Sequence, residues 1–284
     1  MGVCIFIVIF AVHLLTLYLV HSQRDMRYVA LPQEQVRRLS FYLTMEEYIA
    51  RRILPTLGAE ASDGLFFMWQ VRPSVIFGRN QVMENEVNMD YCQTHGIEVF
   101  RRKSGGGCVY ADEHNLMLSF VCHSEHVGLT YNRFMGMLLL VLRRMGIEAA
   151  STTHNDVLIG DRKVSGTAFR HIPRPTPSSA QPLTASAADY ASIAHATLLY
   201  DTNMENMLQA ITPPEEKLKK RGIESVRQRI TLLKDHTTLG LTEVKALIRD
   251  TLCRGELLLT ADDVREIEEM EITLNSKIWN KTTN

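Results

Sequence analysis

The most informative segment of the chain reads Arg101-Arg102-Lys103-Ser104-Gly105-Gly106-Gly107-Cys108-Val109-Tyr110. In it, three consecutive glycines follow a triplet of cationic side chains. Glycine lacks a Cβ atom and adopts positive φ at little cost, so the peptide N–H groups of such a segment can converge on an anion. The segment fits neither of the common phosphate patterns, G-x-x-x-x-G-K-[ST] or G-x-G-x-x-G after a strand. It therefore predicts a phosphate-binding loop of another kind, although an isolated glycine triplet can also simply turn one strand into the next.

Short runs of apolar, aromatic and β-branched residues around this segment predict strands. Leu65–Gln70 and Ser74–Gly78 are two such runs, separated by the turn residues Arg72-Pro73. Glu98–Arg102 predicts a third strand that enters the glycine segment, and Leu116–Val121 predicts a fourth that leaves it. The glycine segment is thus expected to connect two strands of a sheet.

Later segments add a hairpin and a long connection. Val157–Ile159 and Lys163–Gly166 flank Gly160-Asp161, which predicts a β-hairpin. Residues 173–188 combine several prolines with many Ser, Thr and Ala residues and predict a mobile loop. Thr197–Tyr200 then predicts the strand that follows the loop.

Helices are predicted between these strands. Thr44, with Glu47 in the capping-box position, predicts the start of a helix. The other helices are predicted at Tyr131–Met145, Pro213–Lys220, Thr242–Leu252 and Ala261–Glu269. Since no repeat or linker interrupts this mixture of strands and helices, we expect one α/β domain over residues 26–284.

Composition excludes several classes of function. The chain has 284 residues, of which 45% are hydrophobic and 22% are charged, as in an ordinary globular protein. Its formal net charge of −1 provides no global basic field, which argues against a nucleic-acid partner. The five cysteines are scattered and contain no C-x-x-C pair, which favours a reducing, cytoplasmic compartment over a disulfide framework or a zinc site.

Residues 1–25 form a hydrophobic N-terminal segment with three interpretations. Val3 to Val20 are nearly all apolar and barely long enough to span a bilayer. Little positive charge precedes this stretch, and it has no good small-x-small cleavage site. A membrane anchor and a signal peptide therefore stay open, but we favour translated sequence upstream of a true start at Met26.

Three further blocks follow the glycine segment along the chain. They are Asn155-Asp156-Val157-Leu158-Ile159-Gly160-Asp161-Arg162-Lys163-Val164-Ser165-Gly166-Thr167-Ala168, His195-Ala196-Thr197-Leu198-Leu199 and Arg221-Gly222-Ile223-Glu224-Ser225-Val226-Arg227-Gln228-Arg229. Together the four blocks resemble the lipoate-protein ligase A family of the biotin and lipoate ligase superfamily. The resemblance implies an α/β fold of the α+β type, with a central mixed, largely antiparallel sheet flanked by helices, as in class II synthetases and biotin ligases.

The resemblance also implies the residues of a site. It makes Lys163 the catalytic lysine, whose ammonium would neutralise charge that develops between a carboxylate oxygen and the α-phosphorus. It makes Asp156 a residue that helps to place magnesium. The implied substrate and adenylate contacts are Arg102, Ser104, Gly105, Gly106, Gly107, Asn155, Ser165, Gly166, His195, Arg221 and Gly222.

Several of these residues also have a simpler interpretation. Lys163 could be a solvated lysine beside a hairpin, and Asn155 with Asp156 could only cap a turn. His195 could be a core histidine with satisfied hydrogen bonds. Arg221-Gly222 could be a turn on a charged surface.

The reaction that the resemblance implies has two steps. Lipoate attacks the α-phosphate of ATP to give lipoyl-adenylate and pyrophosphate, and a lysine of an acceptor domain then attacks the acyl carbon. ATP and Mg²⁺ are thus the implied cofactors. The implied acceptors are lipoyl domains of 2-oxoacid dehydrogenase complexes and the glycine-cleavage carrier protein, and neither a nucleic acid nor a membrane is expected as a partner.

Two alternative functions stay open. A lipoyl or octanoyl transferase would use a pre-activated acyl donor and a cysteine nucleophile of lowered pKa. The corresponding segments, Ser151–His154 and Ser192–His195, contain no cysteine, which favours the ligase. A non-catalytic lipoyl-binding protein is the other alternative, and the presence of Lys163 argues against it.

The chain departs from the family pattern at three places. The family's loop usually continues Val-Tyr/Phe-His-Asp-x-Gly-Asn, whereas this chain has Val109-Tyr110-Ala111-Asp112-Glu113-His114-Asn115, which puts the metal or phosphate geometry in doubt. Ala196 replaces a glycine of the histidine block. The sequence ends soon after Trp279-Asn280, where longer members continue into a small accessory domain. We therefore expect activation from ATP to be weaker than transfer from pre-formed adenylate, unless a separate subunit supplies that domain.

Overall fold

An eight-stranded sheet forms the centre of the protein. The computed structural model describes residues 26–33, 35–57, 63–124, 126–152, 155–173, 190–211 and 229–279. The strands of the sheet are β1 (Arg27–Ala30), β2 (Leu65–Trp69), β6 (Leu116–His123), β7 (Ala150–Ser151), β8 (Asp156–Ile159), β9 (Arg162–Pro173), β10 (Tyr190–Leu198) and β11 (Gly255–Leu258). Their order is β11-β1-β2-β6-β10-β9-β8-β7. Only the pairs of β1 with β2 and β11 are parallel, so the predicted mixed, largely antiparallel sheet is confirmed.

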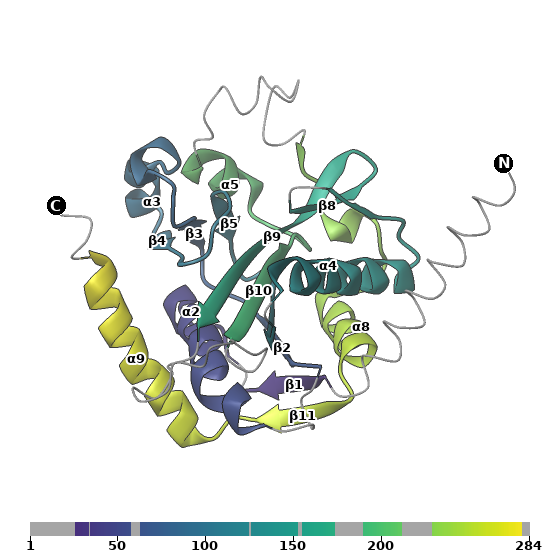
Figure 1. Ribbon diagram of the computed structural model, residues 1–284. Helices are drawn as coiled ribbons and strands as arrows, with labels where there is room; N and C mark the ends of the chain where they lie inside the picture. The colour runs from purple at the N-terminus through teal and green to yellow at the C-terminus, as the bar shows by residue number, and fades with distance from the viewer. Residues whose placement is uncertain are drawn as a thin grey trace, which may run out of the picture.

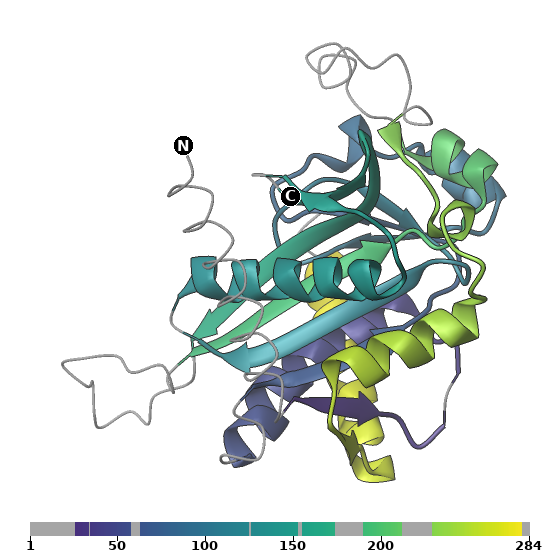
Figure 2. The same ribbon diagram turned by 90° about the vertical axis from the view of Figure 1, so that its right-hand side faces the viewer.

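Helices cover both faces of this sheet (Figures 1 and 2). One face carries α4 (Val127–Arg144) and α8 (Leu241–Leu252), and the other carries α2 (Leu39–Tyr48) and α9 (Ala261–Trp279). Successive residues of a strand point to opposite faces. Phe66 therefore lies in the apolar core under α4, whereas its neighbour Phe67 lies in the core under α2. The two-sided burial explains why these strands read as continuous apolar runs.

A second, three-stranded sheet packs beside the first and was not predicted from the sequence. Its order is β4-β3-β5, with bounds β3 (Ser74–Phe77), β4 (Glu98–Arg101) and β5 (Val109–Ala111). Two short helices, α3 (Met89–Thr94) and α5 (Met204–Ala210), lie next to it in Figure 1. The glycine segment connects β4 to β5, so its ends are fixed by strands of this second sheet.

Some predicted boundaries were wrong. Helix α2 begins at Leu39, and Thr44 lies inside it with its hydroxyl donating to the Ser40 carbonyl oxygen at 2.8 Å, so there is no capping box at Thr44. The chain continues as a π-helical segment at Ile49–Ile53 and a 3₁₀ turn at Leu54–Thr56. Helices α4 and α9 are longer than predicted, by residues before Tyr131 and after Glu269. Further 3₁₀ turns lie at Met83–Asn85 and Leu233–Asp235.

The predicted hairpin is confirmed. Strands β8 and β9 pair antiparallel around Gly160, whose φ of 61° is one that glycine adopts readily. The strand predicted at Thr197–Tyr200 is the end of the longer β10, which stops at Leu198. The predicted loop after Pro173 and the predicted helix at Pro213–Lys220 lie outside the described residues. Within the described ranges, no helix combines the length and apolar character that crossing a membrane requires.

Candidate active site

Small side chains open space on the α2 side of the large sheet. The register between β9 and β10 pairs Gly166 with Thr197 and Ala168 with His195. The glycine segment lies above this surface, since a Cβ atom built on Gly106 would lie 3.7 Å from the Ala168 Cβ atom. Two neighbouring cavities occupy the space between the sheet and the segment, one narrow and one of about 510 Å³.

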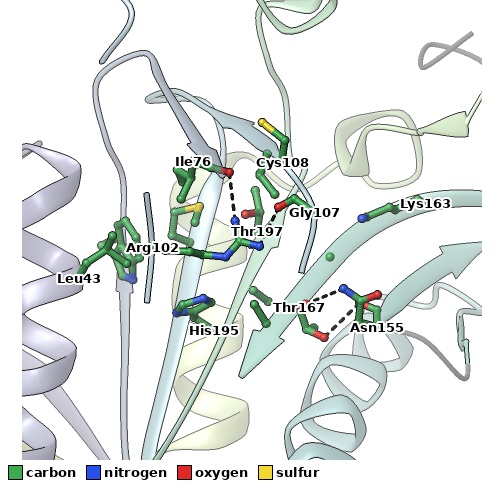
Figure 3. Close-up of a pocket in the computed structure, with 16 residues that line it drawn as sticks. Leu43, Ile76, Arg102, Gly107, Cys108, Asn155, Lys163, Thr167, His195 and Thr197 are labelled. Carbon is green, nitrogen blue, oxygen red and sulfur yellow. Dashed lines mark hydrogen bonds between the residues drawn. The ribbon is translucent and has the colours of Figure 1, made fainter. Parts of the chain in front are cut away.

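The narrow cavity is mostly apolar. It is lined by Leu43, Trp69, Ile76, Arg102, Gly107, Cys108, Val109, Met117, Asn155, Lys163, Gly166, Thr167, Ala168, His195, Ala196 and Thr197. Figure 3 shows Leu43 of α2 at one end and Lys163 of β9 at the other. The indole of Trp69 stacks on Tyr42, with ring centroids 4.9 Å apart, and donates to the Ser119 hydroxyl. An apolar chain with a polar head at the Lys163 end would fit this shape.

Arg102 supports the glycine segment from inside. Its guanidinium donates to the carbonyl oxygens of Ile76, Gly105 and Gly107 at 2.6–3.0 Å, and the residue is 5% exposed. Burial lowers the pKa of this guanidinium to about 10, which still leaves it charged at neutral pH. The sequence predicted a direct phosphate contact, but in this structure the described hydrogen bonds of the Arg102 side chain go to backbone carbonyls.

The glycines of the segment are required to different degrees. Gly106 has a φ of 91°, and a Cβ atom there would lie 2.8 Å from an Arg102 guanidinium nitrogen. A Cβ atom on Gly78, at the end of β3, would overlap the Gly106 carbonyl oxygen. In contrast, a Cβ atom on Gly105 or Gly107 would have open space around it. Gly106 and Gly78 therefore allow the close approach that shapes the segment.

Ser104 and His195 are joined to Glu46 in a buried hydrogen-bonded chain. The Ser104 hydroxyl lies 2.9 Å from His195 Nε2, and His195 Nδ1 lies 3.0 Å from Glu46 Oε1. Glu46 also accepts a hydrogen bond from the Ser119 hydroxyl at 2.6 Å. The chain fixes the imidazole ring in the wall of the narrow cavity, so the structure brings Ser104 and His195 together as part of one network.

Lys163 lies at the junction of the two cavities. Its ammonium is 2.7 Å from Asp156 Oδ1, and Arg229 lies 3.1 Å from the other oxygen of the same carboxylate. Burial alone would raise the pKa of Asp156, but the two cations outweigh burial and hold this pKa below its ordinary value. A Cβ atom built on Gly166 would lie 2.5 Å from Lys163 Nζ, so the ammonium occupies space that only glycine leaves open.

Asn155 is fixed to the neighbouring strand. Its side-chain nitrogen donates to the Thr167 carbonyl oxygen at 2.8 Å, and its own carbonyl oxygen accepts from the Thr167 backbone N–H and hydroxyl. Asn155 thereby lines both cavities next to Lys163 (Figure 3). Ser165, in contrast, lines neither cavity, because it is buried one position from Gly166 on an alternating strand. Arg221 and Gly222 lie outside the described residues.

The other two cations of the glycine segment point away from the large cavity. Arg101 donates to the carbonyl oxygens of Arg79 and Gln81. Lys103 lies 2.5 Å from the Glu47 carboxylate, which also contacts Arg51 and Arg170. These contacts hold α2, β9 and the segment together.

The large cavity combines an apolar part with an ionic part. Gln81, Glu86, Gly106, Gly107, Cys108, Val109, Tyr110, Asn155, Asp156, Lys163, Gly166, Thr197, Leu199, Met207, Ile211, Arg229 and Ile230 line it. The glycine segment, Lys163 and Arg229 provide backbone N–H groups and cations, and Tyr110 and Met207 contribute to the apolar part. A ligand with a flat apolar ring and phosphate groups would match both parts.

Ala196, which replaces a glycine of the family pattern, lines the narrow cavity, whereas the two departures at Ala111 and His114 line neither cavity. Ala111 is fully buried in the core under α2, and His114 is exposed. Asp112 accepts hydrogen bonds from His114, Thr202 and Asn203, and so fixes the turn before β6 to the start of α5. The doubt that Ala111 and His114 raised about the phosphate geometry is therefore not supported by their positions.

A magnesium ion could use the Asp156 carboxylate at the Lys163 end of the large cavity. In the described part of the chain, no group of three or more His, Cys, Asp or Glu side chains could hold a metal ion. Mg²⁺ is often bound by one or two carboxylates together with substrate phosphates and water. Asp156 beside Asn155 therefore fits a magnesium ion that arrives with a nucleotide, provided that Lys163 and Arg229 give up the carboxylate oxygens.

Sequence reasoning missed several residues of the site. Glu46 and Trp69 lie on elements that were predicted, but their contacts with β10 and β6 are distant in sequence. The signal for Glu46 was a pair of acidic residues inside an otherwise apolar helix, because a buried carboxylate requires a partner. Gly78 had a weaker signal, as a glycine directly after a strand.

Comparisons with known proteins identify the family that the chain resembles in sequence. Residues 39–253 match the family model of the lipoyl protein ligase A/B catalytic domain. The chain is 32% identical over 235 residues to lipoate–protein ligase 1 of Staphylococcus aureus, covering 80% of this chain and 65% of that relative. It therefore spans slightly less than two thirds of that relative's length.

Solved structures share the fold. A bipartite lipoate protein ligase described with its E2 lipoyl domain from Thermoplasma acidophilum superposes with a TM-score of 0.68 at 24% identity, over 87% of this chain and 92% of that chain. A lipoate-protein ligase A bound with ATP superposes with a TM-score of 0.66 at 21% identity, over 87% of this chain and 94% of that chain. At these identities the likeness is one of fold.

Proposed function

The chain belongs to the lipoyl protein ligase A/B catalytic domain family, and from that premise we propose that it is an ATP-dependent lipoate–protein ligase. It activates lipoate to lipoyl-adenylate with release of pyrophosphate and then transfers the lipoyl group to a lysine of an acceptor lipoyl domain. The observation that carries the proposal is the position of Lys163, whose ammonium lies where an apolar cavity meets a larger, partly ionic one.

The two cavities would bind different substrates of the proposed reaction. The narrow cavity, with Trp69 and Met117 in its walls, would hold the acyl chain, and the large cavity would hold the nucleotide. The carboxylate of the acid would then lie against Lys163. A fixed cation at this point stabilises the negative charge that develops in both the activation and the transfer step.

Magnesium and the glycine segment complete the proposed site. Magnesium, when bound with ATP, would screen the phosphate charges and orient them, and Asp156 and Asn155 are the residues that would hold it. The glycine segment would bind phosphate through backbone N–H groups, with Arg102 supporting its shape from behind. Arg221 and Gly222 stay candidates for adenylate contacts on the strength of the family pattern.

The partners follow from the proposed reaction. The acceptors would be lipoyl domains of 2-oxoacid dehydrogenase complexes and the glycine-cleavage carrier protein, and one fold relative is described together with an E2 lipoyl domain. A separate accessory subunit could assist activation. Because the reaction consumes ATP, we propose a cytoplasmic location.

The decisive experiment supplies the substrates separately. The protein is incubated with lipoate, ATP, magnesium and an unmodified lipoyl domain, and the mass of the domain is measured. The proposal predicts a mass increase of one lipoyl group that requires ATP. A parallel reaction with pre-formed lipoyl-adenylate isolates the transfer step. If the lipoyl domain is modified when an acyl-carrier thioester is the acyl donor, but not when lipoate and ATP are supplied, the proposal is contradicted and a transferase is indicated.

The transferase alternative lacks a suitable nucleophile in the described site. Cys108 lines both cavities, but burial raises the pKa of its thiol to about 12. A cysteine nucleophile requires a lowered pKa, since the thiolate is the reactive form. The Cys108 environment therefore favours the ligase.

A further inference from the structure

One buried carboxylate is shared by two cations at the edge of the large cavity. Asp156 is 6% exposed, and its two oxygens contact Lys163 at 2.7 Å and Arg229 at 3.1 Å. A charge that is buried to this degree requires a partner, and here each oxygen has a cationic one. Lys163 and Arg229 are therefore held at a common point.

Backbone contacts fix Arg229 beside Lys163. Ile230 forms a parallel bridge with Lys163, and the Thr231 N–H donates to the Lys163 carbonyl oxygen at 2.9 Å. Two residues further on, the Leu233 N–H donates to the Leu199 carbonyl oxygen at 2.7 Å. The segment that carries Arg229 thus runs along the start of β9, and the guanidinium reaches the same cavity as the Lys163 ammonium.

The formal charges of the side chains that line the large cavity cancel. Lys163 and Arg229 are its cationic side chains, and Asp156 and Glu86 are its carboxylates. Arg102 does not line it, because its guanidinium is held by backbone carbonyls. A phosphate group therefore gains full attraction only when Lys163 and Arg229 turn from Asp156 to the ligand.

We propose that Arg229 is a second phosphate-binding cation of the large cavity, and that Asp156 is a positioning residue that holds Arg229 and Lys163 until phosphate replaces it. This inference rests on the proposed function, since it assumes that a nucleotide enters the cavity. An arginine fork can donate two parallel hydrogen bonds to phosphate oxygens, whereas lysine acts as a point charge. Arg229 would thus orient the phosphate while Lys163 faces the acyl group.

The test compares two ligands that differ only in a phosphate group. AMP and adenosine are titrated calorimetrically without magnesium into wild type, Arg229→Gln and Arg229→Lys. We expect Arg229→Gln to weaken AMP binding by about tenfold or more, the effect of losing a charge-assisted hydrogen bond, and to leave adenosine binding unchanged. Arg229→Lys should recover part of the loss. Arg162→Gln, at an exposed position of the same strand as Lys163, serves as the matched control and should bind both ligands like wild type.

Asp156→Asn tests the exchange itself. The amide no longer competes for the two cations, so AMP should bind at least as tightly as to wild type, whereas a merely structural role would weaken binding. Thermal unfolding of each variant shows whether the fold is kept.

The outcomes separate this inference from the proposed function. If wild type ligates lipoate but Arg229→Gln binds AMP like wild type, or loses adenosine affinity equally, the role of Arg229 is wrong and the ligase proposal stands. Weaker AMP binding to a folded Asp156→Asn variant overturns the exchange. If wild type binds neither AMP nor ATP with magnesium, both proposals fall.

Discussion

Lys163 Nζ lies only 2.5 Å from the place where a Gly166 β-carbon would be. The position of this ammonium therefore depends on the absence of a side chain at Gly166. An alanine at this position would push the ammonium away from the junction of the two cavities, because β9 is held on both sides by β8 and β10 and cannot yield. The backbone of Gly166 has no positive φ, so the effect would be one of space rather than strain.

Gly166→Ala should lower lipoylation by up to about 10²-fold, since displacement of a catalytic group by about 1 Å has costs of that size. Stability should change little. Steady-state rates of lipoyl-domain modification, with thermal unfolding as the check on folding, measure both effects. Gly128→Ala adds the same methyl group in helix α4, where nothing opposes it, and it is the control that should keep near-normal activity. Full activity of Gly166→Ala would show that the ammonium position is not critical.

Lys163→Ala should reduce acyl transfer by about 10²-fold or more, the usual cost of removing one fixed charge stabiliser. The variant should fold, because Lys163 lies at the start of β9 and its ammonium is outside the apolar cores. Mass spectrometry of the acceptor domain over time gives the rate, and exposed Arg162→Gln controls for loss of positive charge on the same strand. Near-normal turnover by folded Lys163→Ala would remove the basis of the proposed function.

At the residue scale, local patterns in the sequence singled out residues that lie together in the structure. Lys163, Asn155, Gly106 and Gly107 come from contiguous blocks and line the two cavities. The sequence could not predict that the Arg102 guanidinium would bind carbonyl oxygens, because one of them, that of Ile76, lies on another strand. Nor could it predict the Glu46 contact with His195, which joins residues far apart in the chain.

At the scale of elements, the glycine segment is a connection that two different sheets hold in place. Its ends belong to β4 and β5 of the small sheet, while Gly106 lies over Ala168 of the large one. The hairpin of β8 and β9 was predictable, because its pairing is local and Gly160 marks the turn. The small sheet was not, since its strands are short and β3 pairs with strands that follow a long excursion through α3.

Gly106→Ala should disrupt the glycine segment and destabilise the protein, whereas Gly107→Ala should leave the fold and its stability unchanged. The first change meets both a positive φ and the Arg102 guanidinium, and the second meets open space. Forcing a non-glycine residue into such a conformation costs about 1–3 kcal/mol. Chemical unfolding of the two alanine variants compares their stabilities, and equal stabilities would contradict this account of the segment.

At the scale of the whole molecule, Glu47 connects three parts of the structure. It lies on α2 and contacts Lys103 at the glycine segment and Arg170 on β9. Burial would raise the pKa of this carboxyl, but hydrogen bonds from the two cations lower it to about 2. A depressed pKa in the folded state means that the charged form contributes stability at neutral pH.

This contribution should be complete above about pH 4.5, the ordinary pKa of the group, and should be lost as the pH falls toward about 2. Glu47→Gln should therefore be less stable than wild type at pH 7, and the difference should shrink on acidification. Urea unfolding of both proteins at several pH values measures it. Exposed Glu84→Gln is the matched control, and a Glu47→Gln difference that is independent of pH would refute the assignment.

The Arg102 contacts also determine which way the peptide units of the glycine segment face. The guanidinium draws the carbonyl oxygens of Gly105 and Gly107 inward. In a trans peptide unit the N–H points opposite to the C=O, so the N–H groups of Gly106 and Cys108 point away from the guanidinium. These permanent dipoles are oriented when the protein folds and need no reorientation when an anion arrives. A buried cation whose own hydrogen bonds go to backbone carbonyls can thus act on an anion indirectly, by setting the polarity of the peptide groups in front of it.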